Sequence, residues 1–221
     1  MTERSDLIQG PHQGQPVLSA GEPIDRAKAA MVMVHGRGAT AESILELAFE
    51  LKQPGFIYLA PQAAGNAWYP YSFRAPIASN EPGFSSGLAV ITSILAQVEE
   101  AAIPLERTMI LGFSQGACLS LEFVARHAKR YGGVVGLSGG LIGPDGTPRD
   151  YAGSLAGTPL FLGCSDIDPH IPKEVVEQTS EVLEKLGGNV TTRLYPRMGH
   201  TVNGDEIRFV QGMMTIFKKY T

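Results

Sequence analysis

Cysteine is scarce in this sequence, and long apolar runs are absent from it. The two cysteines, Cys118 and Cys164, are too few for the disulfide framework that stabilises many small secreted domains. No apolar run is long enough to cross a bilayer, and residues 1–6 lack the apolar core of a secretory signal. We therefore expect no stable membrane insertion, and we predict a cytoplasmic location.

The sequence also lacks an excess of basic residues. It has 18 Lys and Arg against 22 Asp and Glu, a formal net charge of −4, so a nucleic-acid partner is not expected. With 221 residues, of which 43% are hydrophobic, the chain suits one globular domain with little room for a separate lid domain. We predict an N-terminal lead over residues 1–28, mostly loop with an edge strand at 16–18, and a single domain over residues 29–221. The oligomeric state is left open, a homodimer included.

Continuous apolar runs alternate with helical patterns along most of the chain. Such runs suit strands that are buried on both faces, as in a parallel sheet. The alternation predicts the α/β class, with a mainly parallel sheet and helices on both of its faces. In sheets of this kind the functional groups gather at the carboxyl ends of the strands. The predicted strands cover residues 29–34, 56–61, 109–111, 132–138, 158–164 and 190–195.

One segment, residues 112–116, has the pattern G-x-S-x-G with Ser114 at its centre. An apolar strand precedes it and a helical pattern follows, which is the context in which such a serine is a nucleophile. The sharp turn requires small neighbours, and it aims the N–H of Gln115 at any negative charge that forms beside the serine. With 26 glycines in the chain, the bare pattern also has a fair chance of arising at random.

A serine nucleophile needs a base to remove its proton and a carboxylate to orient that base. His200 alone among the five histidines follows the last predicted strand, in a turn before the last helix, and it is our candidate base. His35 lies in a glycine turn, and we expect it to orient that turn rather than to abstract protons. The loop after the strand at 158–164 carries two acids, Asp166 and Asp168, and position alone leaves the choice between them open.

The connection from residue 62 to residue 82 is long and rich in aromatic residues. Long loops over a sheet edge are often functional, so Trp68, Tyr69 and Phe73 are candidate walls of a substrate pocket. The alternative is a loop that only packs its own aromatic side chains.

Four motifs in this order resemble the phospholipase/carboxylesterase family, a group that includes acyl-protein thioesterases and bacterial carboxylesterases. They lie at residues 35–38, 112–116, 168–172 and 199–201. The resemblance implies an α/β-hydrolase fold with Ser114 as nucleophile, Asp168 as acid and His200 as base, with Asp166 as the alternative acid. It implies an oxyanion hole formed by the backbone N–H groups of Arg37 and Gln115, and it requires no metal or organic cofactor.

The family resemblance also implies a function, namely hydrolysis of a small-molecule ester through an acyl-enzyme. The aromatic loop looks more like that of the bacterial esterases, so short-chain or aryl carboxylic esters are the expected substrates. Thioesters and lysophospholipids are alternative substrates. The sequence favours less strongly an acyltransferase, or a binding protein whose triad is not catalytic. Acyl-protein thioesterases usually carry an aliphatic residue at the position of Arg37, whose side chain is expected either to reach solvent or to favour anionic substrates.

Overall fold

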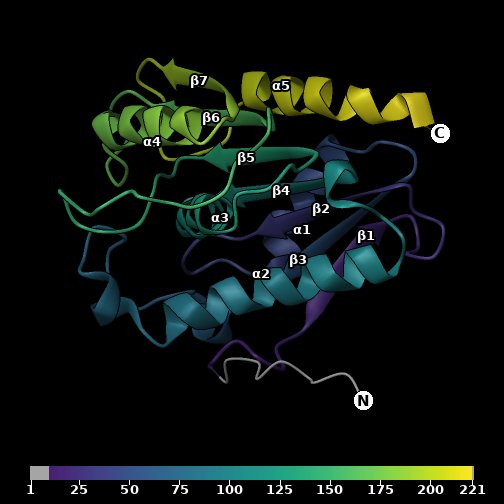
Figure 1. Cartoon of the computed structure of the whole chain (residues 1–221), viewed down its shortest axis with the longest axis horizontal. Coiled ribbons are helices and arrows are strands. Elements are labelled where there is room, and N and C mark those ends of the chain that lie inside the picture. The colour runs from purple at the N-terminus through teal and green to yellow at the C-terminus, as the bar shows by residue number, and fades with distance from the viewer. Residues whose placement is uncertain (1–9, 221) are drawn as a thin grey trace.

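The computed structural model describes residues 10–220 and contains a seven-stranded sheet with helices on both faces (Figure 1). The strands are β1 (Val17–Gly21), β2 (Ala29–Val34), β3 (Phe56–Pro61), β4 (Thr108–Phe113), β5 (Gly133–Leu137), β6 (Pro159–Ser165) and β7 (Asn189–Tyr195). The α-helices are α1 (Ala41–Glu50), α2 (Gly83–Glu100), α3 (Gln115–Arg126), α4 (Lys173–Lys185) and α5 (Gly204–Met214). Short 3-10 turns occupy Ala64–Asn66, Ile77–Asn80, Leu105–Arg107 and Thr215–Tyr220.

The strand order is β1-β3-β2-β4-β5-β6-β7, and every pairing except that of β1 with β3 is parallel. The central strands are buried on both faces, which explains their continuous apolar sequences. The edge strand expected at 16–18 runs over Val17–Gly21, and its partly exposed residues alternate because one of its faces meets solvent.

Two apolar layers enclose the sheet. On one face Ile91 of α2, Leu119 of α3 and Val176 of α4 belong to the larger core. On the other face Ile44 of α1 and Val210 of α5 belong to the second core. Because β2, β4, β5, β6 and β7 are parallel neighbours, their carboxyl ends lie at the same edge of the sheet. None of the described helices has both the length and the apolarity needed to cross a lipid bilayer.

In the described part of the N-terminal lead, residues 10–28, His12 is buried although most of its neighbours are exposed. His12 is only 3% exposed, because its Nε2 lies 2.9 Å from the carbonyl oxygen of Trp68 and its Nδ1 accepts the N–H of Ala64 at 3.1 Å. Burial lowers the pKa of His12, which favours the neutral imidazole that these two contacts need. Through His12, the lead therefore contacts the backbone of the aromatic loop at Ala64 and Trp68.

Candidate active site

Ser114 lies between β4 and α3 in a strained backbone conformation, with φ 54° and ψ −119°. Positive φ is costly for a residue with a side chain, and such strain persists only when the surroundings enforce it. Two glycines do so here: a Cβ on Gly112 would overlap the backbone of Gly116, and a Cβ on Gly116 would overlap the carbonyl oxygen of Val34. The motif therefore lets strand and helix approach closely and turns the serine out at the edge of the sheet.

A continuous hydrogen-bonded chain joins three side chains that are far apart in the sequence. Nε2 of His200 lies 2.8 Å from Oγ of Ser114, and Nδ1 of His200 lies 2.8 Å from Oδ2 of Asp168. The imidazole is partly exposed, at 19%, whereas the carboxylate of Asp168 is fully buried. An imidazole between a hydroxyl and a carboxylate is the arrangement that activates a serine.

The loop around Asp168 keeps this carboxylate ionised. Burial alone would raise its pKa, but hydrogen bonds from His200 and from the N–H groups of His170 and Ile171 outweigh burial and lower the pKa. Both N–H groups donate to Oδ1, at 2.8 and 3.0 Å, which leaves Oδ2 for the imidazole.

The other acid of this loop has a different contact. Oδ1 of Asp166 accepts the N–H of Arg197 at 2.8 Å, and the Asp166 N–H donates to the carbonyl oxygen of Tyr195 at 3.0 Å. Asp166 therefore ties the acid loop to the turn that carries His200, and it does not contact the imidazole in this structure.

Two backbone N–H groups are the predicted oxyanion donors. The Gln115 N–H is the first of α3, next to Ser114 in the chain, and the turn after β2 that carries Arg37 passes close to the serine, since a Cβ on Gly36 would lie 3.3 Å from that of Ser114. Among the described residues neither N–H has a hydrogen-bond partner, as expected of donors kept for a ligand. The Gln115 side chain, 6% exposed, accepts the N–H of Trp68 and donates to the carbonyl oxygen of Tyr69, both at 2.8 Å.

His35 holds the glycine turn in place. Its Nε2 accepts the N–H of Ala63 at 3.0 Å, so its Nδ1 carries the proton and donates to the carbonyl oxygen of Gly36 at 2.8 Å. The side chain is fully buried, and burial lowers its pKa. His35 is therefore a neutral residue that stabilises the turn, and it takes no part in the hydrogen bonds that join Ser114, His200 and Asp168.

The Arg37 side chain is exposed, as the solvent-facing alternative predicted, but it also makes contacts that the sequence did not predict. Its guanidinium donates to the carbonyl oxygens of Tyr69, Pro70 and Tyr71 at 2.8, 2.9 and 2.6 Å, so it clamps the aromatic loop. With its donors directed at three carbonyl groups, the guanidinium is poorly placed to select anionic substrates.

We expect Arg37→Gln to lower kcat/KM for the ester hydrolysis that the sequence motifs predict by about tenfold, because the aromatic loop loses the guanidinium that donates to three of its carbonyl groups. The kcat/KM of Arg37→Lys should lie between those of the unmodified protein and Arg37→Gln, since one ammonium group cannot donate to all three carbonyl groups as the guanidinium does. Steady-state kinetics on a neutral and an anionic ester test this. Arg74→Gln is the matched control, since Arg74 lies on the same loop but pairs with Asp145 on the surface. A loss confined to the anionic ester would instead show charge recognition.

Ser114 and His200 line a cavity of about 360 Å³. Of the three aromatic residues expected to wall it, Tyr69 and Phe73 do so, whereas Trp68 does not. Trp68 is fully buried, and its indole N–H donates to the carbonyl oxygen of His35 at 2.9 Å, so it belongs to the core beneath the loop. The cavity is lined by Arg37, Tyr69, Tyr71, Ser72, Phe73, Ser114, Gln115, Cys118, His170, Ile171 and His200.

Some of these lining residues were not expected from the sequence. The His170 ring packs edge-on against the His200 ring, with centroids 4.8 Å apart. Cys118 lies one helical turn after Ser114, and that spacing was the available signal that it would face the same cavity.

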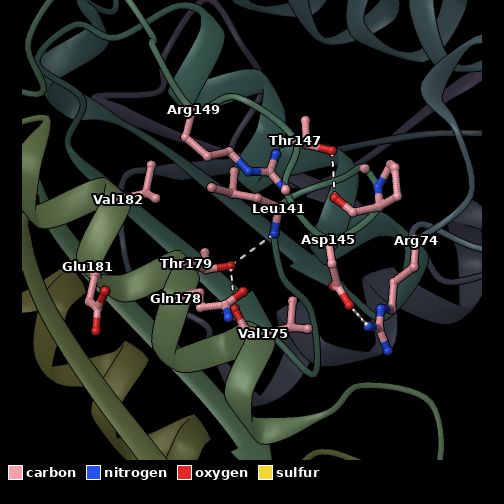
Figure 2. A pocket seen from close by; sticks show the side chains of 13 residues that line it. Arg74, Leu141, Asp145, Thr147, Arg149, Val175, Gln178, Thr179, Glu181 and Val182 are labelled. Atoms are coloured by element: carbon pink, nitrogen blue, oxygen red, sulfur yellow. Dashed lines mark hydrogen bonds and ion pairs between the residues drawn. The ribbon is translucent and has the colours of Figure 1, made fainter.

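A second hollow, of about 300 Å³, has a lining that shares no residue with that of the first (Figure 2). Figure 2 shows the ion pair between Arg74 and Asp145 at 2.8 Å, and the Leu141 N–H donating to Oγ1 of Thr179 at 3.0 Å. Neither Ser114 nor His200 lines this hollow, so the chemistry belongs to the first cavity. Among the described residues no group of three or more His, Cys, Asp or Glu side chains is placed to hold a metal ion.

Glu206, in the first turn of α5, was not singled out by the sequence. Its Oε2 accepts the N–H of Asn203 at 2.8 Å and so caps the helix that follows the His200 turn, but its buried Oε1 has no partner among the described residues. Burial raises the pKa of this carboxyl to about 7, the charge of Asp205 adds to the rise, and the Asn203 N–H partly opposes it.

We expect Glu206→Gln to stabilise the protein above neutral pH. The folded-state pKa lies above the ordinary value of 4.5, so the protein loses stability as pH rises from 4.5 to about 7, by roughly 3 kcal/mol. Glutamine keeps the cap but cannot ionise, so its advantage over glutamate should grow by a similar amount across this interval. Urea unfolding at about pH 5 and about pH 8.5 measures the difference in unfolding free energy between Glu206→Gln and the unmodified protein. Glu100→Gln, at an exposed position, is the control. A pH-independent difference would contradict the prediction.

The strand order, the crossover helices and the serine turn place the chain in the α/β-hydrolase class. It shares 30% identity over 214 residues with acyl-protein thioesterase 1 of Debaryomyces hansenii, covering 87% of this chain and 92% of that protein. The corresponding Candida albicans protein is 31% identical over 215 residues, which cover 85% and 93%. A solved phospholipase/carboxylesterase from Dyadobacter fermentans superposes with a TM-score of 0.89 at 40% identity, covering 94% of this chain and 99% of that one.

The chain belongs to the phospholipase/carboxylesterase family, whose model matches residues 17–217. It is therefore a hydrolase of a serine hydrolase family, as its sequence motifs indicated.

Proposed function

We propose that the protein is a carboxylesterase that cleaves short-chain or aryl esters through a covalent acyl-enzyme. The observation that carries this proposal is the unbroken line of contacts from Ser114 through His200 to Asp168, with 2.8 Å at each step. Each contact has the length and the partners that nucleophilic catalysis requires.

In the proposed reaction, Oγ of Ser114 attacks the ester carbonyl carbon while Nε2 of His200 takes the hydroxyl proton. The carbonyl π electrons move to the oxygen, and the N–H groups of Arg37 and Gln115 stabilise the resulting oxyanion. Collapse expels the alcohol, which receives the proton from Nε2, and leaves an ester on Ser114. Water, deprotonated by the same nitrogen, then attacks the acyl carbon. The bond to Oγ of Ser114 breaks, Oγ takes the proton back from Nε2 and the acid leaves, while Asp168 stabilises the imidazolium in both halves.

The size of the cavity supports short substrates. Its volume of about 360 Å³ lies near the low end of ligand pockets, which span roughly 300–1,000 Å³. The nearly buried Tyr69, Phe73 and Ile171 close its walls. A short acyl group, or an aromatic one, suits such a space better than a long acyl chain does.

A second candidate function is acyl-thioester hydrolysis, favoured by the 30% and 31% identity to proteins named acyl-protein thioesterase 1. The same nucleophile and oxyanion donors serve an ester and a thioester, so the distinction lies in the shape of the cavity.

Hydrolysis rates over p-nitrophenyl esters of rising chain length, with matched thioesters, test the proposal. We expect kcat/KM to peak between acetyl and butyryl and to exceed that of the thioesters. A maximum at palmitoyl, or a preference for thioesters, would favour the second candidate. An alcohol acceptor that diverts the acyl group from water would instead identify an acyltransferase. A protein that neither turns over esters nor reacts with a fluorophosphonate would be a binding protein.

A further inference from the structure

The loop that carries Asp168 also places a second imidazole in the active-site cavity. His170 follows Asp168 by two residues, is exposed, and lines the cavity together with Ser114 and His200. Its backbone N–H donates to Oδ1 of Asp168 at 2.8 Å, so the contact that holds the carboxylate also fixes where the His170 side chain begins. The proposed reaction as described above assigns no role to this side chain.

The His170 ring reaches the imidazole of His200. Two ring contacts to that imidazole are present among the described residues, with centroid distances of 5.0 Å to Phe113 and 4.8 Å to His170. Phe113 does not line the cavity, whereas His170 does. A ligand group that reaches His200 from the cavity therefore lies next to the His170 ring.

The proposed reaction decides which part of an ester lies at that place. When the tetrahedral intermediate collapses, Nε2 of His200 gives its proton to the alcohol oxygen, which must then be within hydrogen-bond reach of Nε2. The former carbonyl oxygen points instead to the backbone N–H groups of Arg37 and Gln115. The alcohol part of the ester thus lies on the His200 side of the serine, beside His170.

The nitrogens of the His170 ring are available to a substrate. Neither of them has a hydrogen-bond partner among the residues that the structure describes. By contrast, the side chains of Arg37 and Gln115, which also line the cavity, already bind the backbone of the aromatic loop. An imidazole has at least one N–H donor whatever its protonation state, so it complements an oxygen acceptor in the alcohol.

We propose that His170 determines specificity by donating a hydrogen bond to an ether or hydroxyl oxygen in the alcohol part of the substrate. The proposal rests on the carboxylesterase function above, and it narrows the substrates to short-chain esters of oxygenated alcohols. A site that pairs with an oxygen discriminates against the analogue that lacks it. Because the alcohol leaves when the acyl-enzyme forms, His170 selects for the leaving group and not for the acyl group.

Butyrate esters that differ only in their alcohol test this. The pairs are methoxyethyl and n-butyl butyrate, and hydroxyethyl and n-propyl butyrate, in which an oxygen replaces one carbon. For each pair the ratio of kcat/KM is compared between the unmodified protein and His170→Phe, so the intrinsic reactivities of the esters cancel. Phenylalanine keeps a ring against His200 but has no N–H donor. We expect the preference for the oxygenated ester to fall about three- to tenfold in at least one pair.

Two controls separate this selectivity from a structural role. The ratio of p-nitrophenyl acetate to p-nitrophenyl butyrate, which share one leaving group, should change by less than about twofold in His170→Phe. His127→Phe makes the same replacement at another exposed histidine that does not line the cavity, and it should leave every ratio within about twofold.

Two results would overturn the proposal. If His170→Phe lowered kcat/KM equally for all four butyrates, or not at all, the ring would at most position His200. If the acetate-to-butyrate ratio changed as much as the alcohol ratios, the ring would shape the whole cavity and not the alcohol side. An unmodified protein that hydrolyses none of these esters would instead refute the carboxylesterase function itself.

Discussion

A Ser114→Ala variant is expected to lose ester hydrolysis almost completely, with kcat lower by about 10⁴- to 10⁶-fold. The reason is that the covalent route needs the oxygen that lies 2.8 Å from Nε2 of His200, and alanine provides none. The residual rate would come from the two N–H donors alone. Initial rates on p-nitrophenyl butyrate measure the loss, and labelling by a fluorophosphonate should vanish in parallel.

The fold should survive this change, because alanine has the same Cβ in the strained conformation at φ 54°. Circular dichroism and the unfolding temperature check that point. Ser120→Ala is the matched control, since Ser120 is buried on the same helix and its hydroxyl has no partner among the residues that the structure describes. A Ser114→Ala enzyme that keeps more than about one per cent of its activity would show that another group is the nucleophile.

An Asp168→Asn variant is expected to lower kcat by about 10³- to 10⁴-fold. The N–H groups of His170 and Ile171 would hold the one oxygen that the new amide side chain retains, so its NH₂ group would face Nδ1 of His200. Nδ1 would then have to accept a hydrogen bond, which places the ring proton on Nε2. The imidazole would thus donate toward Ser114 when it should remove the serine proton.

Asp166→Asn is the matched control for this variant. Its Oδ1 only accepts the N–H of Arg197, a contact that an asparagine oxygen can keep, so kcat should change by less than about threefold. The comparison is made on the same ester at several pH values. If Asp166→Asn were the more damaging of the two, the acid would have to be reassigned.

Much of the fold follows from local signals along the chain. The doubly buried strands, such as β2 and β4, appear as continuous apolar runs because each face meets a layer of helices. The turn at Ser114 also has a local signature, since only glycine at positions 112 and 116 fits the close approach of strand and helix. The order of serine, acid and histidine, each after its own strand, then predicts which edge of the sheet carries the chemistry.

Side-chain partners were predicted less well, because they depend on segments that are distant in the sequence. The pattern of aromatic residues in the loop after β3 does not show that Trp68 points into the core while Tyr69 lines the cavity. The clamp made by Arg37 spans more than thirty positions, and no periodicity encodes it. The unpaired carboxyl oxygen of Glu206 likewise arises only when α5 packs on the sheet.

The sequence by itself determined the class of fold, the family, and the turn that strains Ser114, because these depend on short-range spacing and on the sizes of neighbouring residues. The tertiary structure alone decided that Asp168 contacts the imidazole while Asp166 supports the turn, and that Trp68 lies in the core while Tyr69 lines the cavity. The physical reason is that a hydrogen bond depends on distance and direction within a few tenths of an ångström, which only the packing of the whole chain fixes.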